Sequence, residues 1–369
     1  MKILYGVQAT GNGHITRARV LAPLLRARGA DVTWLFTGRP WDQLFDMAPF
    51  GDFEWRRGLT FSTHSGHVHY LRTAISNDLI RFARDVRALD LTSYDLVVTD
   101  FEPVTAWAAK LRGVEAIGIG HQYAFEHPIP RTGDDPLSRT VMRHFAPASI
   151  HLGLHWHHFD QPILPPIIET PPEPDRIADD KILVYLPFEE IEDVVDLLAE
   201  FTSHQFFVYS TATARCKPDH LHIRQLCRVG FHQDLRNASG VICNAGFELA
   251  SEALQMGKKL LVKPLRAQLE QMSNALALEQ IQLGAVMPEL DRASVSFWLR
   301  NGRANRVVFP NVGEAIADWL LSGQRSIDPE WVRSIWARVE YRTEPSPATG
   351  AAKPEGDPAR NPQPSMPSA

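Results

Sequence analysis

The chain of 369 residues has only three cysteines, Cys216, Cys227 and Cys243. An odd number with this spacing matches neither a disulfide framework nor a zinc ribbon. A cysteine-poor composition of this kind is typical of a reducing compartment, so we expect a cytoplasmic location.

Long apolar runs and an excess of basic charge are also lacking. No stretch approaches the roughly 18 apolar residues of a membrane-spanning helix, and the apolar run in the N-terminal MKILYG is too short for a signal peptide. The formal net charge of −5 gives no field that attracts nucleic acid. We therefore expect a soluble protein with no nucleic-acid partner. A peripheral contact with the inner face of the membrane stays open, because it requires only a surface patch.

In each half of the sequence, predicted strands alternate with predicted helices. In the first half we predict strands at 2–7, 31–36, 95–99 and 115–119, and helices at 14–28, 72–89 and 104–111. In the second half we predict strands at 181–186, 205–209, 240–243 and 259–262, and helices at 189–201, 247–255 and 270–280. Such alternation indicates an α/β fold with parallel sheets.

The proline-rich sequence ILPPIIETPPEP at 163–174 separates the two halves, because so many prolines exclude a helix or a central strand. The end of the chain is rich in Pro, Ala, Ser and Gly, which predicts disorder. We therefore expect these parts: an N-terminal domain at 1–163, a linker at 164–180, a C-terminal domain at 181–325, a C-terminal helix at 326–342 and a disordered tail at 343–369.

Polar side chains follow the predicted strands of the first half. Asp100 and Glu102 come after one strand, and His121 and Gln122 after the next. Ligands of open α/β sheets bind at the carboxyl ends of the strands, so these four residues are candidates for a site. The alternative for Asp100 is that it only caps the next helix.

The loop VQATGNGHITRA, from Val7 to Ala18, places Gly13 and His14 at the start of a predicted helix. Its Gly11-Asn12-Gly13 suggests a dinucleotide loop, but Thr16 stands where that loop has its third glycine. The next strand also ends at Phe36-Thr37-Gly38-Arg39 without the expected acidic residue. An arginine there suits a 2′-phosphate, so an NADP-dependent oxidoreductase stays open.

The segment from Cys243 to Ala275 carries the strongest functional pattern. A strand ends at Cys243, and Asn244-Ala245-Gly246 turns into a helix whose free amide groups make an anion site. Glu252 lies nearly two turns into that helix, where a carboxylate can accept from the vicinal hydroxyls of a ribose. Glu270, Gln271 and Asn274 open the next helix, and such a group suits a hydroxyl-rich ligand.

This segment resembles the donor half of GT-B glycosyltransferases of the UDP-glycosyltransferase and peptidoglycan N-acetylglucosaminyltransferase group. The motifs GNGHITRA, DFEP, GHQYAF and GFELASEAL resemble a bacterial and archaeal branch of that superfamily. The resemblance covers roughly residues 1 to 320 and implies two Rossmann-like domains that face each other across a cleft. It further implies a nucleotide-sugar donor, with UDP as the expected nucleotide, and a glycan, lipid or small-molecule acceptor.

The resemblance also implies roles for individual residues. Glu252 would bind the donor ribose, and Glu270 and Gln271 the hydroxyls of the transferred sugar. The remaining implied positions are Gly246 and Phe247 facing the diphosphate, Phe231 and His232 at the base, and His14 in the cleft opposite the donor.

Two features depart from the family pattern. Asn244 and Ala245 stand where related enzymes often have arginine and serine, and the loop at 186–190 lacks the usual glycines. Both departures lie at positions that would contact the diphosphate, so the resemblance leaves the identity of the nucleotide open.

We therefore hypothesise an inverting, metal-independent glycosyltransferase without a cofactor, in which His14 is the general base and Asp100 or Glu102 is the second choice. On the donor side Asn244 and Asn274 complete the set, and on the acceptor side Gly13, His121 and Gln122. Besides the NADP enzyme, the alternatives are a sugar-nucleotide 2-epimerase and a sugar-nucleotide sensor on the same scaffold. The segment HLGLHWHHFD also places His151, His155 and His157 on one face of a strand, which would suit a metal, although an edge strand facing the other domain explains it more simply.

Overall fold

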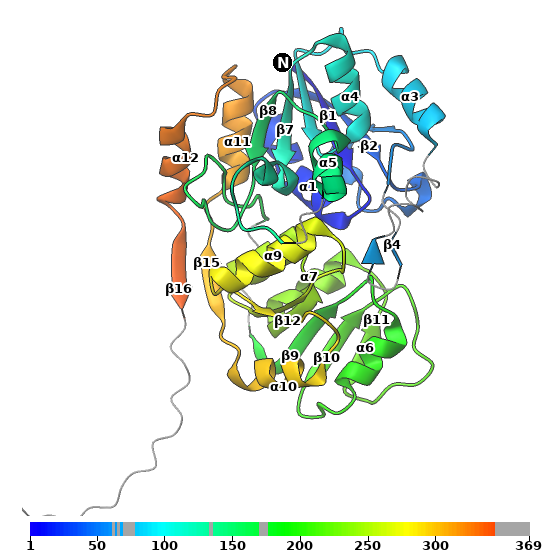
Figure 1. Cartoon of the computed structure of the whole chain (residues 1–369), viewed down its shortest axis with the longest axis vertical. Helices are drawn as coiled ribbons and strands as arrows, with labels where there is room; N and C mark the ends of the chain where they lie inside the picture. Colours follow the sequence, from blue (N-terminus) through cyan, green and yellow to red (C-terminus); the bar gives the residue numbers. More distant parts are fainter. Residues whose placement is uncertain (61–62, 65–66, 69–77, 133–135, 170–175, 344–369) are drawn as a thin grey trace, which may run out of the picture.

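The computed structural model describes residues 1–60, 63–64, 67–68, 78–132, 136–169 and 176–343. The chain forms two α/β halves, one above the other in Figure 1, each built on a six-stranded sheet. All neighbouring strands within these two sheets run parallel. The predicted fold class, two Rossmann-like parallel sheets, is therefore confirmed.

The first sheet has the strand order β3-β2-β1-β6-β7-β8. Its strands are β1 (Lys2–Gln8), β2 (Asp31–Thr37), β3 (Glu54–Trp55), β6 (Leu96–Asp100), β7 (Ala116–Gly120) and β8 (Ile150–Gly153). The central strands are buried apolar runs, as a parallel sheet covered on both faces requires. The order reverses between β1 and β6, and a ligand site is expected at such a point.

The second sheet has the order β11-β10-β9-β12-β13-β14. Its strands are β9 (Ala178–Tyr185), β10 (Gln205–Tyr209), β11 (Leu221–Arg224), β12 (Ala238–Asn244), β13 (Lys259–Lys263) and β14 (Ala285–Val286). The order reverses between β9 and β12, so the two sheets share one topology.

Helices cover both sheets. They are α1 (Asn12–Ala27), α3 (Leu79–Ala88), α4 (Pro103–Arg112), α5 (Pro136–Phe145), α6 (Ile191–Leu198), α7 (Arg228–Asn237), α8 (Phe247–Gln255), α9 (Leu269–Gln280), α10 (Arg292–Asn301), α11 (Val312–Leu321) and α12 (Pro329–Trp336). The helix predicted at 72–89 corresponds to α3, and its residues 72–77 lie outside the described residues. No described helix has the length and apolar character needed to cross a membrane.

Helices α11 and α12 lie beside the N-terminal half, as Figure 1 shows. Helix α11 packs on α1, where a Cβ on Gly313 would stand 3.0 Å from Leu24. Arg28 of α1 donates to Asp318 of α11 at 2.5 Å. The Trp336 indole donates to the Ile163 carbonyl at 2.7 Å. The sequence placed α11 in the C-terminal domain, but its apolar face covers α1.

The segment predicted as one helix at 326–342 is also different. Only α12 is helical, and β16 (Glu340–Thr343) follows and pairs antiparallel with β15 (Asn305–Val308). The predicted tail beyond residue 343 lies outside the described residues.

The linker is partly structured. Ile163, Leu164 and Ile167 are fully buried, and Leu164 bridges to Leu154. Strand β9 begins at Ala178, before the predicted end of the linker at residue 180. One buried apolar cluster includes residues of both sheets and of α1, α8 and α11, so the halves share a core.

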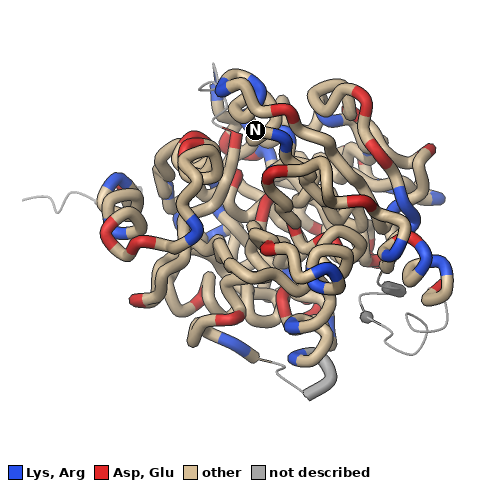
Figure 2. The backbone as a smooth tube through the Cα atoms, turned by 90° about the horizontal axis from the view of Figure 1, so that it is seen from above, with Lys and Arg blue, Asp and Glu red and all other residues tan. Residues whose placement is uncertain are grey.

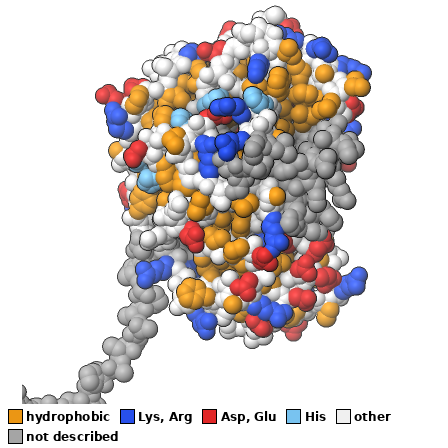
Figure 3. Space-filling model, in the orientation of Figure 1, with side chains coloured by type: hydrophobic (Ala, Val, Ile, Leu, Met, Phe, Trp, Pro, Cys, Tyr) orange, Lys and Arg blue, Asp and Glu red, His pale blue; other side chains and the backbone are white. Residues whose placement is uncertain are grey.

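Acidic and basic residues are mixed over the part of the chain that the structure describes. Figure 2 shows acidic and basic residues interspersed along the backbone, and Figure 3 shows apolar, acidic and basic side chains mixed over both halves of one face. This distribution agrees with the small net charge of −5.

Candidate active site

A histidine–aspartate pair lies at the strand ends of the first sheet. In the sheet register Val7 of β1 stands beside Asp100, the last residue of β6, so the loop after β1 reaches Asp100 directly. His14, in the first turn of α1, places its Nδ1 2.7 Å from Asp100 Oδ1. Asp100 is fully buried, whereas 13% of the His14 side chain is exposed. The histidine can therefore meet a ligand while the aspartate cannot.

Arg17 holds the same aspartate in a two-point contact. Its Nε and Nη2 donate to Asp100 Oδ2 and Oδ1 at 3.0 and 2.7 Å. Burial acts to raise the pKa of Asp100, but Arg17 and His14 outweigh it, so the pKa is lowered. Asp100 is thus an ionised hydrogen-bond acceptor. It does not cap α4, which was the alternative role for it.

Glu102 is the residue that caps α4. Its carboxylate accepts from the amides of Val104 and Thr105, both at 2.6 Å, and from the Thr37 hydroxyl at 3.0 Å. The side chain is fully buried, and this burial raises the pKa of Glu102. These contacts are those of an N-cap residue, and both carboxylate oxygens are used in them.

His121 and Asn274 connect the two halves. His121 opens a 3₁₀ turn, η3 (His121–Glu126), directly after β7, and its Nε2 lies 2.6 Å from Asn274 Oδ1 on α9. Asn274 Nδ2 donates to the Ala245 carbonyl at 2.9 Å. The His121 ring stacks on Phe247 of α8 at a centroid distance of 4.0 Å. The Phe247 ring therefore packs between the two halves. The backbone amide is the part of Phe247 that can face a diphosphate at the start of α8.

Gln122 and Glu270 make a second connection nearby. Gln122 Nε2 donates to Glu270 Oε2 at 3.0 Å, and Gln122 Oε1 is buried without a hydrogen-bond partner among the described residues. Gln271 accepts from the Leu265 amide at 3.0 Å and so fixes the loop before α9. Glu270 and Gln122 thus face the junction, whereas the Gln271 oxygen serves the loop.

The start of α8 has the features of an anion site. Gly246 is the N-cap residue, and no side chain of a described residue caps this helix. A Cβ on Gly246 would meet open space. Asn244 donates to the Lys263 carbonyl at 3.0 Å, and its Oδ1 is buried without a partner in the described chain. The glycine-free loop contributes Glu189, which pairs with Lys263 at 2.6 Å.

Two carboxylates of α8 lie one turn apart beside this start. Glu248 forms a buried ion pair with Arg17 of α1. Burial raises the pKa of Glu248 to about 7 and that of Glu252 to about 8, and the charge of Glu248 raises the pKa of Glu252 further. A Cβ on Gly13 would lie 2.7 Å from Glu248 Cγ, so only glycine fits where α1 meets α8. Gly13 is therefore a packing residue of the junction.

Phe231 and His232 lie inside α7, a helix that the sequence did not predict. The Phe231 amide donates to the Cys227 carbonyl at 2.8 Å, so it is already used within the helix. Its ring packs on Tyr209 at a centroid distance of 4.9 Å. Burial lowers the pKa of His232, and the charge of Arg228 acts in the same direction.

A cavity of about 680 Å³ lies between α1, the linker and the start of α7. Its charged lining residues are Arg19, Arg26, Asp46, Glu169 and Arg228. Glu169 and Arg228 also act on the charge of Glu252, so Glu252 lies close to this cavity.

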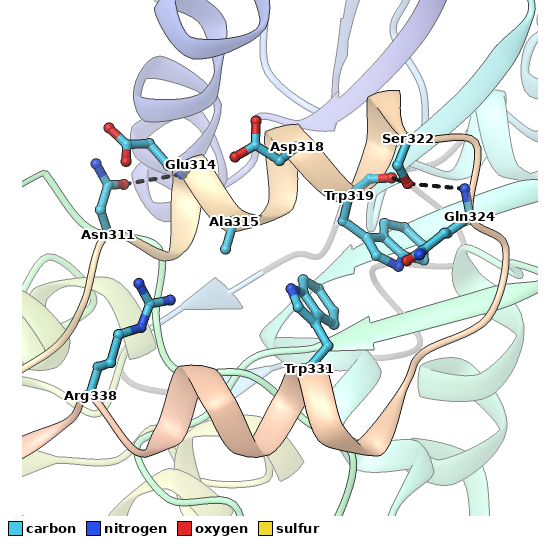
Figure 4. Close-up of a pocket in the computed structure, with 9 residues that line it drawn as sticks. All are labelled: Asn311, Glu314, Ala315, Asp318, Trp319, Ser322, Gln324, Trp331 and Arg338. Carbon is cyan, nitrogen blue, oxygen red and sulfur yellow. Dashed lines mark hydrogen bonds between the residues drawn. The ribbon is translucent and has the colours of Figure 1, made fainter.

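A second pocket, of about 410 Å³, separates α11 from α12 (Figure 4). Trp319 and Trp331 lie nearly parallel in it, with centroids 5.8 Å apart. None of its lining residues is a predicted site residue.

The histidine-rich segment makes backbone contacts. His155 and His157 accept from the amides of Trp156 and Phe159, each at 2.9 Å, and His151 Nε2 lies 3.0 Å from the Ala148 carbonyl. Among the described residues there is no group of three or more side chains suited to hold a metal. Strand β8 lies at the edge of its sheet and contains His151, but it ends at Gly153. His155 and His157 follow the strand, so the prediction of one strand face with three histidines is wrong.

The structure thus brings His14, Asp100, His121, Gln122, Asn274 and Glu270 together with the start of α8. Arg17 and Glu248 belong to the same group and were not predicted. Spacing was the available signal, since Arg17 is one turn after His14 and Glu248 one turn before Glu252. Neither spacing reveals that the two side chains meet.

Comparison with known proteins identifies the family of the chain. The sequence model of glycosyl transferase family 1 matches residues 1–301. No curated protein sequence gave a match.

Solved structures of glycosyltransferases share the fold at low sequence identity. The spinosyn rhamnosyltransferase SpnG, complexed with spinosyn aglycone, has a TM-score of 0.56 and 15% identity over 91% of this chain and 97% of its own. The glycosyltransferase VinC in complex with dTDP has a TM-score of 0.51 and 14% identity over 91% and 100%. SnogD from Streptomyces nogalater has a TM-score of 0.50 and 16% identity over 91% and 99%. Together with the family match, the two-sheet fold identifies the chain as a glycosyltransferase that belongs to glycosyl transferase family 1.

Proposed function

We propose that this glycosyltransferase moves a sugar from a nucleoside diphosphate sugar to an acceptor hydroxyl, with inversion and without a metal ion. The observation that carries the proposal is the His14–Asp100 pair, which lies beside the uncapped start of α8. A single displacement at an anomeric carbon needs a base for the attacking hydroxyl and an anion site for the leaving diphosphate. His14 would be the base, and the start of α8 the anion site.

The proposed reaction uses His14 as the general base. His14 Nδ1 lies 2.7 Å from Asp100 Oδ1 and 2.9 Å from Arg17 Nη2, which is also directed to that oxygen. The ionised Asp100 can only accept, so the tautomer that it favours carries the imidazole proton on Nδ1 and leaves Nε2 unprotonated. Nε2 takes the proton of the acceptor hydroxyl as its oxygen attacks the anomeric carbon. The bond between that carbon and the diphosphate oxygen breaks on the opposite face, and the diphosphate leaves with the electron pair.

The C-terminal half would hold the donor. The amides at the start of α8 face the leaving diphosphate and stabilise its charge without a cation. Glu252 binds the ribose, and the adjacent cavity near Arg228, Phe231 and His232 takes the base. Glu270 meets the sugar hydroxyls, with Gln122, His121 and Asn274 beside it. Asn274 and Gln271 hold the backbone around this pocket.

The nucleotide and the acceptor are tested directly. The family resemblance favours UDP, and the complex of VinC with dTDP adds thymidine nucleotides. A thermal-shift screen with UDP-, dTDP- and GDP-sugars should give one stabilising series, and incubation of that donor with candidate glycan, lipid and small-molecule acceptors is followed by mass spectrometry. A glycosylated acceptor with free nucleoside diphosphate supports transfer. An isomerised donor would instead mean a 2-epimerase, and a bound but unchanged donor a sensor.

Replacing Glu252 with alanine tests the donor assignment. Because burial raises the pKa of Glu252 to about 8, the carboxyl is largely protonated at pH 7. We therefore expect the Kd for the nucleoside diphosphate to rise roughly 2- to 10-fold at that pH, because a neutral hydrogen bond contributes about 0.5–1.5 kcal/mol. Isothermal titration calorimetry measures this change. The matched control is Glu279→Ala, an exposed glutamate on α9, which should leave the Kd unchanged. Equal affinity of the Glu252 variant and the wild type would remove Glu252 from the donor site.

The oxidoreductase alternative finds less support. Arg39, the residue suited to a 2′-phosphate, donates to Asn12 Oδ1 at 2.9 Å and to the Thr10 carbonyl at 3.2 Å. Its guanidinium thus braces the loop that would have to bind the dinucleotide.

A further inference from the structure

The proposed anion site contains a carboxylate of its own helix. Glu248 stands in the first turn of α8, and only 7% of the residue is exposed. One of its oxygens accepts from Arg17 Nη1, while Oε2 is buried and has no hydrogen-bond partner in the part of the chain that the structure describes. A buried acceptor left unpaired is costly, and this one lies where a ligand with its own charge would enter.

The charges around Glu248 do not favour a further anion. Arg17 faces it from α1, Asp100 from β6 and Glu270 from α9, and Glu252 lies one turn along the same helix. Asp100 already occupies two nitrogens of the buried Arg17 guanidinium. The nitrogen that binds Glu248 is therefore the part of Arg17 that a ligand can recruit.

Diphosphate and Glu248 compete for the same two partners, the Arg17 Nη1 and the positive end of α8. A diphosphate that enters beside an ionised Glu248 meets a like charge in a poorly solvated site. If Glu248 is neutral, the repulsion is removed and its carboxyl gains a proton to donate. Glu248 can take up this proton near neutral pH, because burial raises its pKa in the free enzyme to about 7.

We propose that the donor diphosphate displaces Glu248 from Arg17. Arg17 Nη1 then binds a phosphate oxygen, and the Glu248 carboxylate takes up one proton from the solvent. The inference rests on the proposed function, which places the diphosphate at the start of α8. In this exchange Arg17, a residue of the N-terminal half, supplies the positive charge that stabilises the leaving diphosphate. When no donor is bound, Glu248 takes the place of the diphosphate and pairs with Arg17 across the two halves.

Calorimetry with UDP and with dTDP tests this exchange in the full chain. Titrations at pH 7.5 in two buffers of different ionisation enthalpy count the protons taken up on binding. We expect the wild type to take up more protons than Glu248→Gln, by a difference that approaches one as the pH rises to 8.5. The Kd of the wild type should rise by up to about tenfold per pH unit above 7 relative to that of the variant, because the wild type must protonate Glu248. The control Glu279→Gln should behave as the wild type does.

The outcomes separate this inference from the proposed function. If a nucleoside diphosphate binds and sugar is transferred, but wild type and Glu248→Gln take up equal numbers of protons, the exchange is wrong and the transferase proposal stands. If neither nucleotide binds and no donor is used, both are wrong. Should Glu248→Gln fail to fold, the wild type alone decides, because a proton count that does not rise between pH 6.5 and 8.5 contradicts the exchange.

Discussion

The variant His14→Ala should lower kcat by roughly 10²- to 10⁴-fold, the usual contribution of a general base. His14 is the exposed member of the pair, and Asp100 fixes its orientation at 2.7 Å. In the proposed reaction His14 contacts the acceptor hydroxyl and not the donor, so the KM for the donor should change far less than kcat. Steady-state kinetics with the donor found in the screen measures both constants.

Glu102→Gln is the comparison for this variant. Glu102 was the other candidate base, but its oxygens bind the first turn of α4. The amide keeps one acceptor, so we expect a loss of stability and a kcat within a few-fold of wild type for the folded enzyme. If His14→Ala turned over as fast as the wild type, or if Glu102→Gln lost activity to the extent expected for His14→Ala, the assignment of the base would be reversed.

The variant Asp100→Ala should lose about 3–5 kcal/mol of unfolding free energy. Removing this carboxylate takes the acceptor from the buried Arg17 Nε and leaves Nη2 with His14 Nδ1, at 2.9 Å, and breaking a buried pair from one side is strongly destabilising. Urea unfolding at pH 7 measures the loss. The pKa of Asp100 is lower in the folded protein than in the unfolded chain, where it is about 4. Its stabilising effect is therefore complete above about pH 4 and is lost as the pH falls toward the folded pKa, so the difference from wild type should shrink over that range.

Asp318→Ala is the matched control for this loss. Asp318 also pairs with an arginine, Arg28, at 2.5 Å, but 68% of its side chain is exposed. Exposed pairs contribute about 0–1 kcal/mol, so this variant should unfold nearly as the wild type does. Equal losses for the two variants would mean that burial does not govern the Asp100 pair.

The local sequence pattern was sufficient to predict helices and strands that alternate along the chain. The predicted helix at 247–255 has the bounds of α8, and the strand at 205–209 those of β10. Alternation of apolar runs with turn residues is a property of neighbouring residues, so it can be recognised without tertiary information. The same pattern placed Asp100 at the end of β6 and His121 directly after β7.

Helix α7 was missed because its own sequence is a weak signal. RVGFHQDLRN contains a glycine and few apolar residues, and only Asp234 and Leu235 are buried. Its apolar contacts are made by Phe231 with aromatic rings of β9 and β10. Tertiary packing, rather than propensity, decides such a segment.

The sequence by itself determined the α/β class, the two repeated halves and the strand ends at which polar side chains gather. Only the tertiary structure decided that Glu102 is a cap while Asp100 pairs with His14, that α11 returns to the first half, and that Arg17 meets Glu248. Arg17 and Glu248 are 231 residues apart. Secondary structure follows from interactions a few residues apart, whereas a buried charge finds its partner only when packing removes the water around both.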